Sequence, residues 1–389
     1  MKVDNKVLEI MCEFIAEGYN CYSSRGEYYC TGVHERLREK GIPITKCKGY
    51  FDECNKCPLY STANMMEWLK ELPRKDKTMN FKVFESSEGN VWKYVFTKDD
   101  MVAETVLYKY NSFYERTVIC CSTMSGCPVG CKFCGTGNRF IRNLTADEIV
   151  EQIATVLSDK NITDVDENGK RFQIMFMSMG EPLLNWDEVE KAIISLHKFY
   201  PNAELLLSTI APMGSESIPR MIQLSKTIDK VGLQFSIHKS NDTDRNKLIP
   251  YKNKLTLEMI RDLGILWWQQ TERHPYLNYC IDGTNNTDVD KERLQLLFSP
   301  LVFNFTFSVV CSPNESMKDA GFKNIDAIRD FEQSFLEKGY NTRIFNPAGQ
   351  DDIGGGCGQL WYVQDWMKTH SLEKNRKERM KQNEKCRLV

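Results

Sequence analysis

A chain of 389 residues that is 41% hydrophobic and 27% charged can bury one large core with smaller additions, which excludes disorder along the whole chain. Its formal net charge of -2 gives no overall attraction to nucleic acid. No stretch approaches the roughly 20 apolar residues of a membrane span, and acidic residues interrupt the start, where a signal peptide needs an apolar core. We therefore expect a cytoplasmic protein with no membrane partner.

Four segments follow one another along the chain. Residues 1–76 predict a helical, cysteine-rich N-terminal domain, and 77–112 predict a short antiparallel β meander. From 113 to 362 strands alternate with helices about six times, which predicts an α/β fold, a partial (βα)6 TIM-like barrel of parallel strands. Residues 363–389 predict a basic helical tail, which is more often a solvated helix than a contact with nucleic acid.

The strands and helices of the barrel can be named from the pattern. The expected strands are RTVICC, QIMFM, ELLLST, VGLQFSI, YLNYCI, NFTFSVV and a closing TRIF. The expected helices begin near Ala146, Asp187, Glu216, Leu255, Asp290 and Ile325. In such folds the chemistry lies at the carboxyl ends of the strands.

Five of the 15 cysteines of the chain lie in one segment, ICCSTMSGCPVGCKFCGTG. Disulfides are rare in a reducing compartment, so metal binding or redox catalysis explains the clustering better. Cys127, Cys131 and Cys134 are spaced C-x3-C-x2-C after the first barrel strand. Three thiolates can hold three irons of a [4Fe-4S] cluster and leave the fourth iron open. A zinc site is the alternative, but it would need a fourth ligand and no His or Cys follows nearby.

Polar side chains also follow later strands of the predicted barrel. Hydroxyl and imidazole groups at strand ends suit a ribose or a carboxylate. A structural role for the histidine and a surface turn for the asparagine are the competing interpretations. The candidates are Ser208, Ser236, His238 and Asn314.

The cysteine motif, with Phe133 before its last cysteine, resembles that of the radical S-adenosylmethionine (SAM) enzymes. With RNLTADEI, MGEPLLN, LSTI, FSIH and the glycine-rich DDIGGGCGQL, the chain resembles one branch, the RlmN/Cfr family of RNA adenosine methyl synthases. The resemblance runs from about Glu104 to Tyr362 and implies a radical SAM barrel. It also implies that the open iron binds SAM and that Gly180 and Glu181 contact the SAM amino group.

The resemblance further implies a reaction with two SAM molecules. One SAM methylates Cys357, and a 5'-deoxyadenosyl radical from the second takes a hydrogen atom from that methyl group. The carbon then passes to carbon-2 or carbon-8 of an adenine in structured RNA, 23S rRNA or tRNA. In the family Cys120 resolves the crosslink as a disulfide with Cys357, Glu104 is the proton acceptor, and a flavodoxin or ferredoxin donates electrons.

Several assignments depart from the family or remain open. An exposed carboxylate in the meander is the alternative for Glu104, and Cys121 is expected to be a buried strand residue because neighbouring strand positions face opposite sides. Zinc, a second iron–sulfur cluster and reduced thiols compete as interpretations of Cys47, Cys54 and Cys57. The same chemistry on a peptide, a small molecule or a nucleotide, and a non-catalytic metal-binding module, are the alternative functions.

Overall fold

The computed structural model describes residues 22–24, 27–29, 79–99, 101–136, 139–214, 216–309, 325–345 and 353–354. The chain divides into two compact units, Met1–Thr78 and Met79–Val389. In the first unit, β1 (Tyr22–Ser24) and β2 (Glu27–Tyr29) form an antiparallel hairpin. The following predicted site residues lie outside the described residues: Cys47, Cys54, Cys57, Asn314 and Cys357.

The second unit is built on one ten-stranded sheet, in the order β14-β13-β12-β11-β10-β9-β6-β5-β4-β3. The antiparallel part, which continues to its pairing with β6, comprises β3 (Asn80–Glu85), β4 (Val91–Lys98) and β5 (Met101–Tyr110). The parallel part comprises β6 (Arg116–Cys121), β9 (Phe172–Phe176), β10 (Glu204–Thr209), β11 (Val231–Ser236), β12 (Tyr276–Ile281), β13 (Asn304–Val309) and β14 (Thr342–Phe345). Because β14 and β3 end the order, the sheet is an open barrel, as the sequence pattern predicts.

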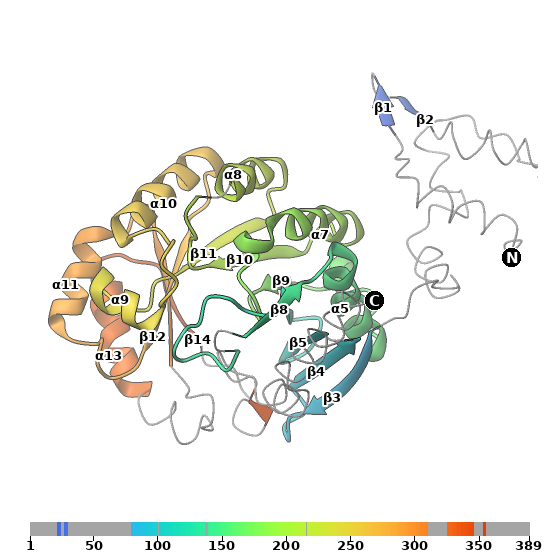
Figure 1. Cartoon of the computed structure of the whole chain (residues 1–389), viewed down its shortest axis with the longest axis horizontal. Coiled ribbons are helices and arrows are strands. Elements are labelled where there is room, and N and C mark those ends of the chain that lie inside the picture. The colour runs from blue at the N-terminus through green and yellow to red at the C-terminus, as the bar shows by residue number, and fades with distance from the viewer. Residues whose placement is uncertain are drawn as a thin grey trace, which may run out of the picture. The chain divides into compact units, whose positions relative to one another are not determined.

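Helices connect the parallel strands and lie outside the curved sheet (Figure 1). The long ones are α5 (Ala146–Asp159), α7 (Trp186–Phe199), α8 (Ser217–Thr227), α10 (Leu257–Thr271), α11 (Asp288–Leu297) and α13 (Ile325–Leu336). Shorter ones are α6 (Val165–Asn168), η1 (Pro182–Asn185) and α9 (Asp242–Leu248). Threonine side chains cap the starts of α5, α10 and α11 by accepting backbone N–H groups, which explains why these helices begin where they do.

The core lies between the sheet and the helices. In β10, Leu205 and Leu207 are fully buried, whereas the alternate positions Leu206 and Ser208 are only partly buried. This period of two sends apolar residues outward to the helices and leaves the inner face for other side chains. No described helix is long and apolar enough to cross a lipid bilayer.

A short hairpin between β6 and α5 is not foreseen in the sequence pattern. It consists of β7 (Met124–Gly126) and β8 (Phe140–Asn143), which pair antiparallel. Its loop carries the cysteine motif, so the motif lies in a closed hairpin rather than directly after the barrel strand.

Candidate active site

Gly126 allows the cysteine hairpin to close. Its φ is +80°, and a Cβ atom built on it would lie 2.0 Å from the carbonyl oxygen of Arg139. That carbonyl accepts a hydrogen bond from the backbone N–H of Cys127 at 2.8 Å. Only glycine therefore permits the two ends of the loop to meet just before the first cysteine.

The three cysteines share one cavity with the strand ends. The cavity has a volume of about 140 Å³. Five further residues proposed from the sequence line it, namely Gly180, Glu181, Ser208, Ser236 and His238. Residues that are separated by more than a hundred positions thus meet at the carboxyl ends of the strands.

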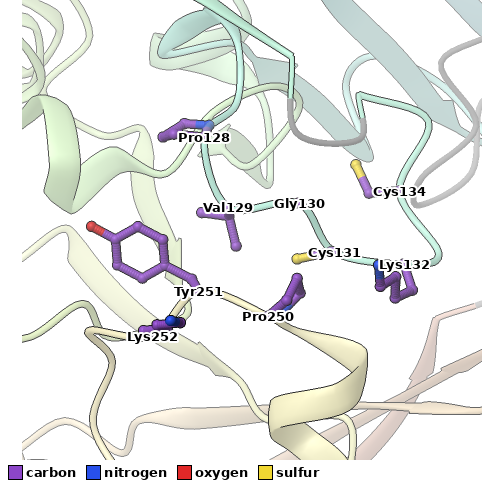
Figure 2. Close-up of a pocket in the computed structure, with 9 residues that line it drawn as sticks. All are labelled: Pro128, Val129, Gly130, Cys131, Lys132, Cys134, Pro250, Tyr251 and Lys252. Carbon is purple, nitrogen blue, oxygen red and sulfur yellow. The ribbon is translucent and has the colours of Figure 1, made fainter.

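The same loop borders a second cavity of about 500 Å³ (Figure 2). Cys131 and Cys134 line it together with Pro250, Tyr251 and Lys252. These two cysteines therefore contribute to both cavities.

The thiols suit a cluster of positive irons. Burial, with some mutual repulsion from neighbouring thiolates, raises the pKa of Cys127 to about 12 and that of Cys131 well above its usual value. Cationic iron would reverse this effect by stabilising the thiolates. Among the described residues, no three His, Cys, Asp or Glu side chains already surround one metal position. The donor set, three soft thiols in one loop, fits three ligands of a [4Fe-4S] cluster once their side chains turn to a common centre.

Gly180 is required by two separate constraints. Its φ is +99°, which side chains rarely adopt, and a Cβ atom would lie 2.7 Å from Oγ1 of Thr123 and 2.8 Å from Cβ of Met124. The backbone therefore passes close to the start of the cysteine hairpin, where Thr123 N–H donates to the Met179 carbonyl at 2.8 Å.

Glu181 is buried and accepts three hydrogen bonds from the protein. Oε1 accepts from the N–H of Leu183 at 3.1 Å and from the hydroxyl of Thr209 at 2.5 Å. Oε2 accepts from the N–H of Ile210 at 2.8 Å. Burial raises the pKa of Glu181 to about 7, and the hydrogen bonds oppose that rise. A carboxylate offers about four acceptor positions, so one remains for a donor in the cavity.

Hydroxyl groups from two neighbouring strands meet on the inner face. Oγ of Ser208 and Oγ of Ser236 lie 3.3 Å apart, and Gln234 donates to Ser208 at 3.2 Å. Such a pair can donate to and accept from a ligand hydroxyl.

His238 is buried with a left-handed backbone, φ +57°. Its Nδ1 accepts the backbone N–H of Cys280 at 3.2 Å, and its ring packs edge-on against Phe133 with centroids 5.1 Å apart. Burial, with smaller contributions from Arg245 and Lys239, lowers the pKa of His238 to about 3. The ring is therefore neutral at working pH, with Nε2 as its hydrogen-bond donor.

Two residues of β12 also line the cavity and were missed in the sequence. Asn278 accepts from the hydroxyl of Ser308 at 3.3 Å, and the sulfur of Cys280 lies 3.0 Å from the same hydroxyl. The pattern that could have found them is alternation along YLNYCI, because both face the side on which Ser208 and Ser236 lie.

A second group of residues lies on the inner face where β4, β5, β6 and β9 run side by side. Cys120 is 8% exposed and packs in an apolar cluster with Val106, Met175 and Ile353. Cys121 is fully buried on the opposite face, as the alternation predicts, and belongs to the core under the helices.

Glu104 is not an exposed carboxylate. It is 2% exposed, and its Oε1 lies 3.1 Å from the ammonium of Lys93. Burial raises the pKa of Glu104 to about 7, while Lys93 opposes the rise. The structure therefore brings Glu104 and Cys120 to one inner face, beside the chain at Ile353 and Gly354.

Known proteins resemble the chain in sequence and in fold. The radical SAM superfamily model matches residues 121–266. A probable dual-specificity RNA methyltransferase RlmN of Thermotoga petrophila is 33% identical over 296 residues, which cover 75% of this chain and 78% of that protein. The corresponding protein of Dictyoglomus thermophilum is 29% identical and covers 84% of this chain and 93% of its own length.

A crystal structure of a radical SAM methyltransferase from Sphaerobacter thermophilus shares the fold with a TM-score of 0.63. It is 24% identical and covers 84% of this chain and 96% of that chain. One third of residues identical across three quarters of both proteins, together with the radical SAM match, decides the assignment. The protein belongs to the RlmN family of radical SAM RNA methyltransferases.

Proposed function

We propose that the enzyme carries a methyl group on Cys357 and transfers its carbon to carbon-2 or carbon-8 of an adenine in rRNA or tRNA. The thiolate of Cys357 attacks the methyl group of one SAM, so that a sulfur–carbon bond forms and S-adenosylhomocysteine leaves. A second SAM then activates that methyl group for addition to the adenine. The Cys120 thiolate then attacks the sulfur of Cys357, so that a sulfur–sulfur bond forms, the sulfur–carbon bond to the base breaks, and the methylated base leaves. A thiol reductant returns the disulfide to two thiols before the next turnover.

One observation carries this proposal. The ammonium of Lys93 donates to the carbonyl of Gly354 at 2.5 Å, and Ile353 packs in the same apolar cluster as Cys120. Cys357 lies three residues further along the chain, and three extended residues span at most about 10 Å. These contacts support a meeting of the two thiols on the inner face.

The cavity beside the cysteine hairpin is the proposed site of SAM. The open acceptor position of Glu181 suits the SAM ammonium, and Gly180 lines the cavity beside it. The hydroxyls of Ser208 and Ser236 and the Nε2–H of His238 suit a ribose or a carboxylate, and Asn314 is assigned to the same group.

Cys127, Cys131 and Cys134 would hold a [4Fe-4S] cluster. When bound, the cluster supplies the single electron that splits SAM, and an external flavodoxin or ferredoxin replaces that electron. The protein's own task is to hold SAM, the methylated thiol and the adenine within reach of one another.

Glu104 and Cys120 are the proposed proton acceptors. A carboxylate with a pKa of about 7 is matched to proton transfer near neutral pH. Its Oε2 is buried without a hydrogen-bond partner among the described residues, which leaves an acceptor open toward the inner face.

Trapping the substrate tests the proposal. The Cys120→Ala variant, loaded with iron and SAM, should accumulate RNA joined to Cys357, because the disulfide that releases the base cannot form. The neighbouring Cys121→Ala variant is the matched control, because that thiol faces the helices and should trap nothing. Digestion and mass spectrometry of the adduct identify the nucleotide and its modified carbon. An adduct with a peptide or a small molecule, or a Cys357 that never gains a methyl group, would contradict the proposal.

A further inference from the structure

Lys93 is a fully buried lysine on the inner face of the sheet. Its side chain is 0% exposed, and it lies opposite Val106 on β5, which lies opposite Cys120 on β6. Residues that face one another across neighbouring strands share one side of a sheet. Lys93 and Cys120 therefore belong to the same face, with the Glu104 carboxylate beside them.

The partners of its ammonium include two groups of different kinds. One is Oε1 of Glu104 at 3.1 Å, and the other is the backbone carbonyl of Gly354 at 2.5 Å. A buried ammonium is retained only where such partners compensate for lost water. One side chain thus connects a carboxylate of the meander to Gly354 within DDIGGGCGQL, 261 residues from Lys93.

Burial has the largest effect on the pKa of Glu104, and the contact with Lys93 limits it; burial likewise lowers the pKa of Lys93, and Glu104 limits that effect. Among the described groups, the Lys93 charge and its hydrogen bond are what oppose the effect of burial on the Glu104 carboxyl. Other described titratable groups on this face are Lys82 of β3, the phenols of Tyr108 and Tyr110 of β5, and Arg116 and the thiol of Cys120 of β6. Arg116 and Arg343 influence the phenol of Tyr110. Because Lys93 holds Oε1 while Oε2 has no described partner, the carboxylate presents one fixed and one open oxygen.

We propose that Lys93 is a positioning residue, which holds the Glu104 carboxylate and the backbone carbonyl of Gly354, three residues before Cys357, in one contact. This inference rests on the proposed function. In contrast to a lysine that only stabilises the fold, Lys93 would couple the proton acceptor to the glycine-rich segment in which Cys357 follows Gly354.

Substitution of Lys93 in the full, iron-loaded chain tests the inference. In K93M the Glu104 carboxyl loses its positive neighbour, so its pKa rises and the acidic limb of the rate of RNA methylation moves to higher pH. Each unit of that shift lowers the rate at a fixed acidic pH about tenfold. K93R keeps the charge and should keep the limb near its original position. K191M removes a lysine from an exposed Lys–Glu pair on α7 and should leave the profile unchanged.

Two further measurements separate the possible outcomes. Hydrogen exchange of the peptide that contains Ile353 and Gly354 should become faster in K93M and stay slow in K191M. If K93M does not fold, the K93M/E104Q double variant removes both charges together, and its Ile353–Gly354 peptide should still exchange faster than that of E104Q alone. An unchanged limb and unchanged exchange in a folded K93M would overturn the inference.

Failure of the proposed function has a different appearance. Wild-type protein would then carry no methyl group on Cys357 by peptide mass spectrometry, whatever the behaviour of Lys93. A methylated Cys357 together with an insensitive K93M profile would reject the role of Lys93 alone.

Discussion

His238 combines a backbone requirement with an electrostatic one. Its left-handed φ of +57° is tolerated best by Gly, Asn, Asp and His, and its Nδ1 has to accept the N–H of Cys280. Burial makes the charged ring unfavourable in the folded state, since the pKa of about 3 lies far below the ordinary value of 6.5. As the pH falls through 6.5, His238 therefore binds a proton in the unfolded state but not in the folded state.

This linkage predicts how acid affects stability. The contribution of His238 is complete above pH 6.5 and is lost as the pH falls toward 3, which amounts to about 2 kcal/mol between pH 7 and pH 5. H238N should remove that part of the pH dependence, because Asn accepts the left-handed φ and its Oδ1 can replace Nδ1 as the acceptor. Urea unfolding of wild type and H238N at both pH values measures the difference.

H238A provides the comparison for this prediction. Alanine removes the titrating ring as well, but it also removes the acceptor and strains the backbone at φ +57°. The free energy of unfolding of H238A should therefore be lower at both pH values, with the same pH dependence as H238N. Equal slopes for wild type and H238N would show that the ring binds its proton at the same pH in the folded and the unfolded state, which contradicts the prediction.

At the scale of single residues, the sequence predicts which residues follow a strand but not which groups they contact. His238 could be placed after a strand because FSIH ends an apolar run. Its neutral form could not be predicted, because the backbone N–H of Cys280, which donates a hydrogen bond to Nδ1, lies 42 residues away on the next strand. Glu104 is similar, since its burial depends on Lys93 and on the pairing of β4 with β5.

The β7–β8 hairpin is the element that aims the cysteines. Gly126 is its closing point, because a Cβ there would lie 2.0 Å from backbone that cannot move away without opening the loop. G126A should therefore take up much less iron on anaerobic reconstitution, because the loop that carries the three thiols can no longer close. Iron and sulfide analysis, with the absorbance of the cluster, measures the loss.

A glycine in another turn of the same unit separates this effect from backbone strain. Gly89, in the turn between β3 and β4, also has a positive φ of +61°, but the nearest atom to its Cβ is the end of the Glu85 side chain at 3.5 Å. G89A should cost stability and still take up iron like wild type. Equal iron content in G126A and wild type would refute the closing role of Gly126.

Long elements were predictable where short ones were not. In the sequence, apolar periodicity indicates the seven parallel strands and six long helices of the described residues. N-cap residues such as Thr145 and Thr287 mark where helices begin. β7 has only three residues, and its partner β8 is separated from it by the cysteine loop. A strand of three residues is too short to show an alternating pattern in the sequence. It forms because Gly126 allows it to pair with β8.

On the scale of the whole molecule, the two sides of the sheet end in different ways, one in a parallel strand and the other in an antiparallel meander. The barrel is completed on one side by β14 and extended on the other by the meander, whose Lys93 and Glu104 face the site. The meander thus shares the inner face of the sheet with Cys120, although its antiparallel order first suggests a separate appendage. That role could not be predicted from periodicity, because strand order in a sheet is set by tertiary pairing.

The division of the chain at Thr78 leads to a last prediction. The cavity, the cysteine hairpin and the core all belong to the unit that begins at Met79. A chain that starts at Met79 should therefore unfold cooperatively, take up iron like the full chain and bind SAM with an affinity within about threefold of it. Its methylation of RNA should fall far more, because we expect residues 1–76 to contact the substrate. Iron content, equilibrium dialysis of SAM and RNA methylation, measured on both chains, separate the two roles. Loss of SAM binding in the shorter chain would show that residues before Met79 help to form the site.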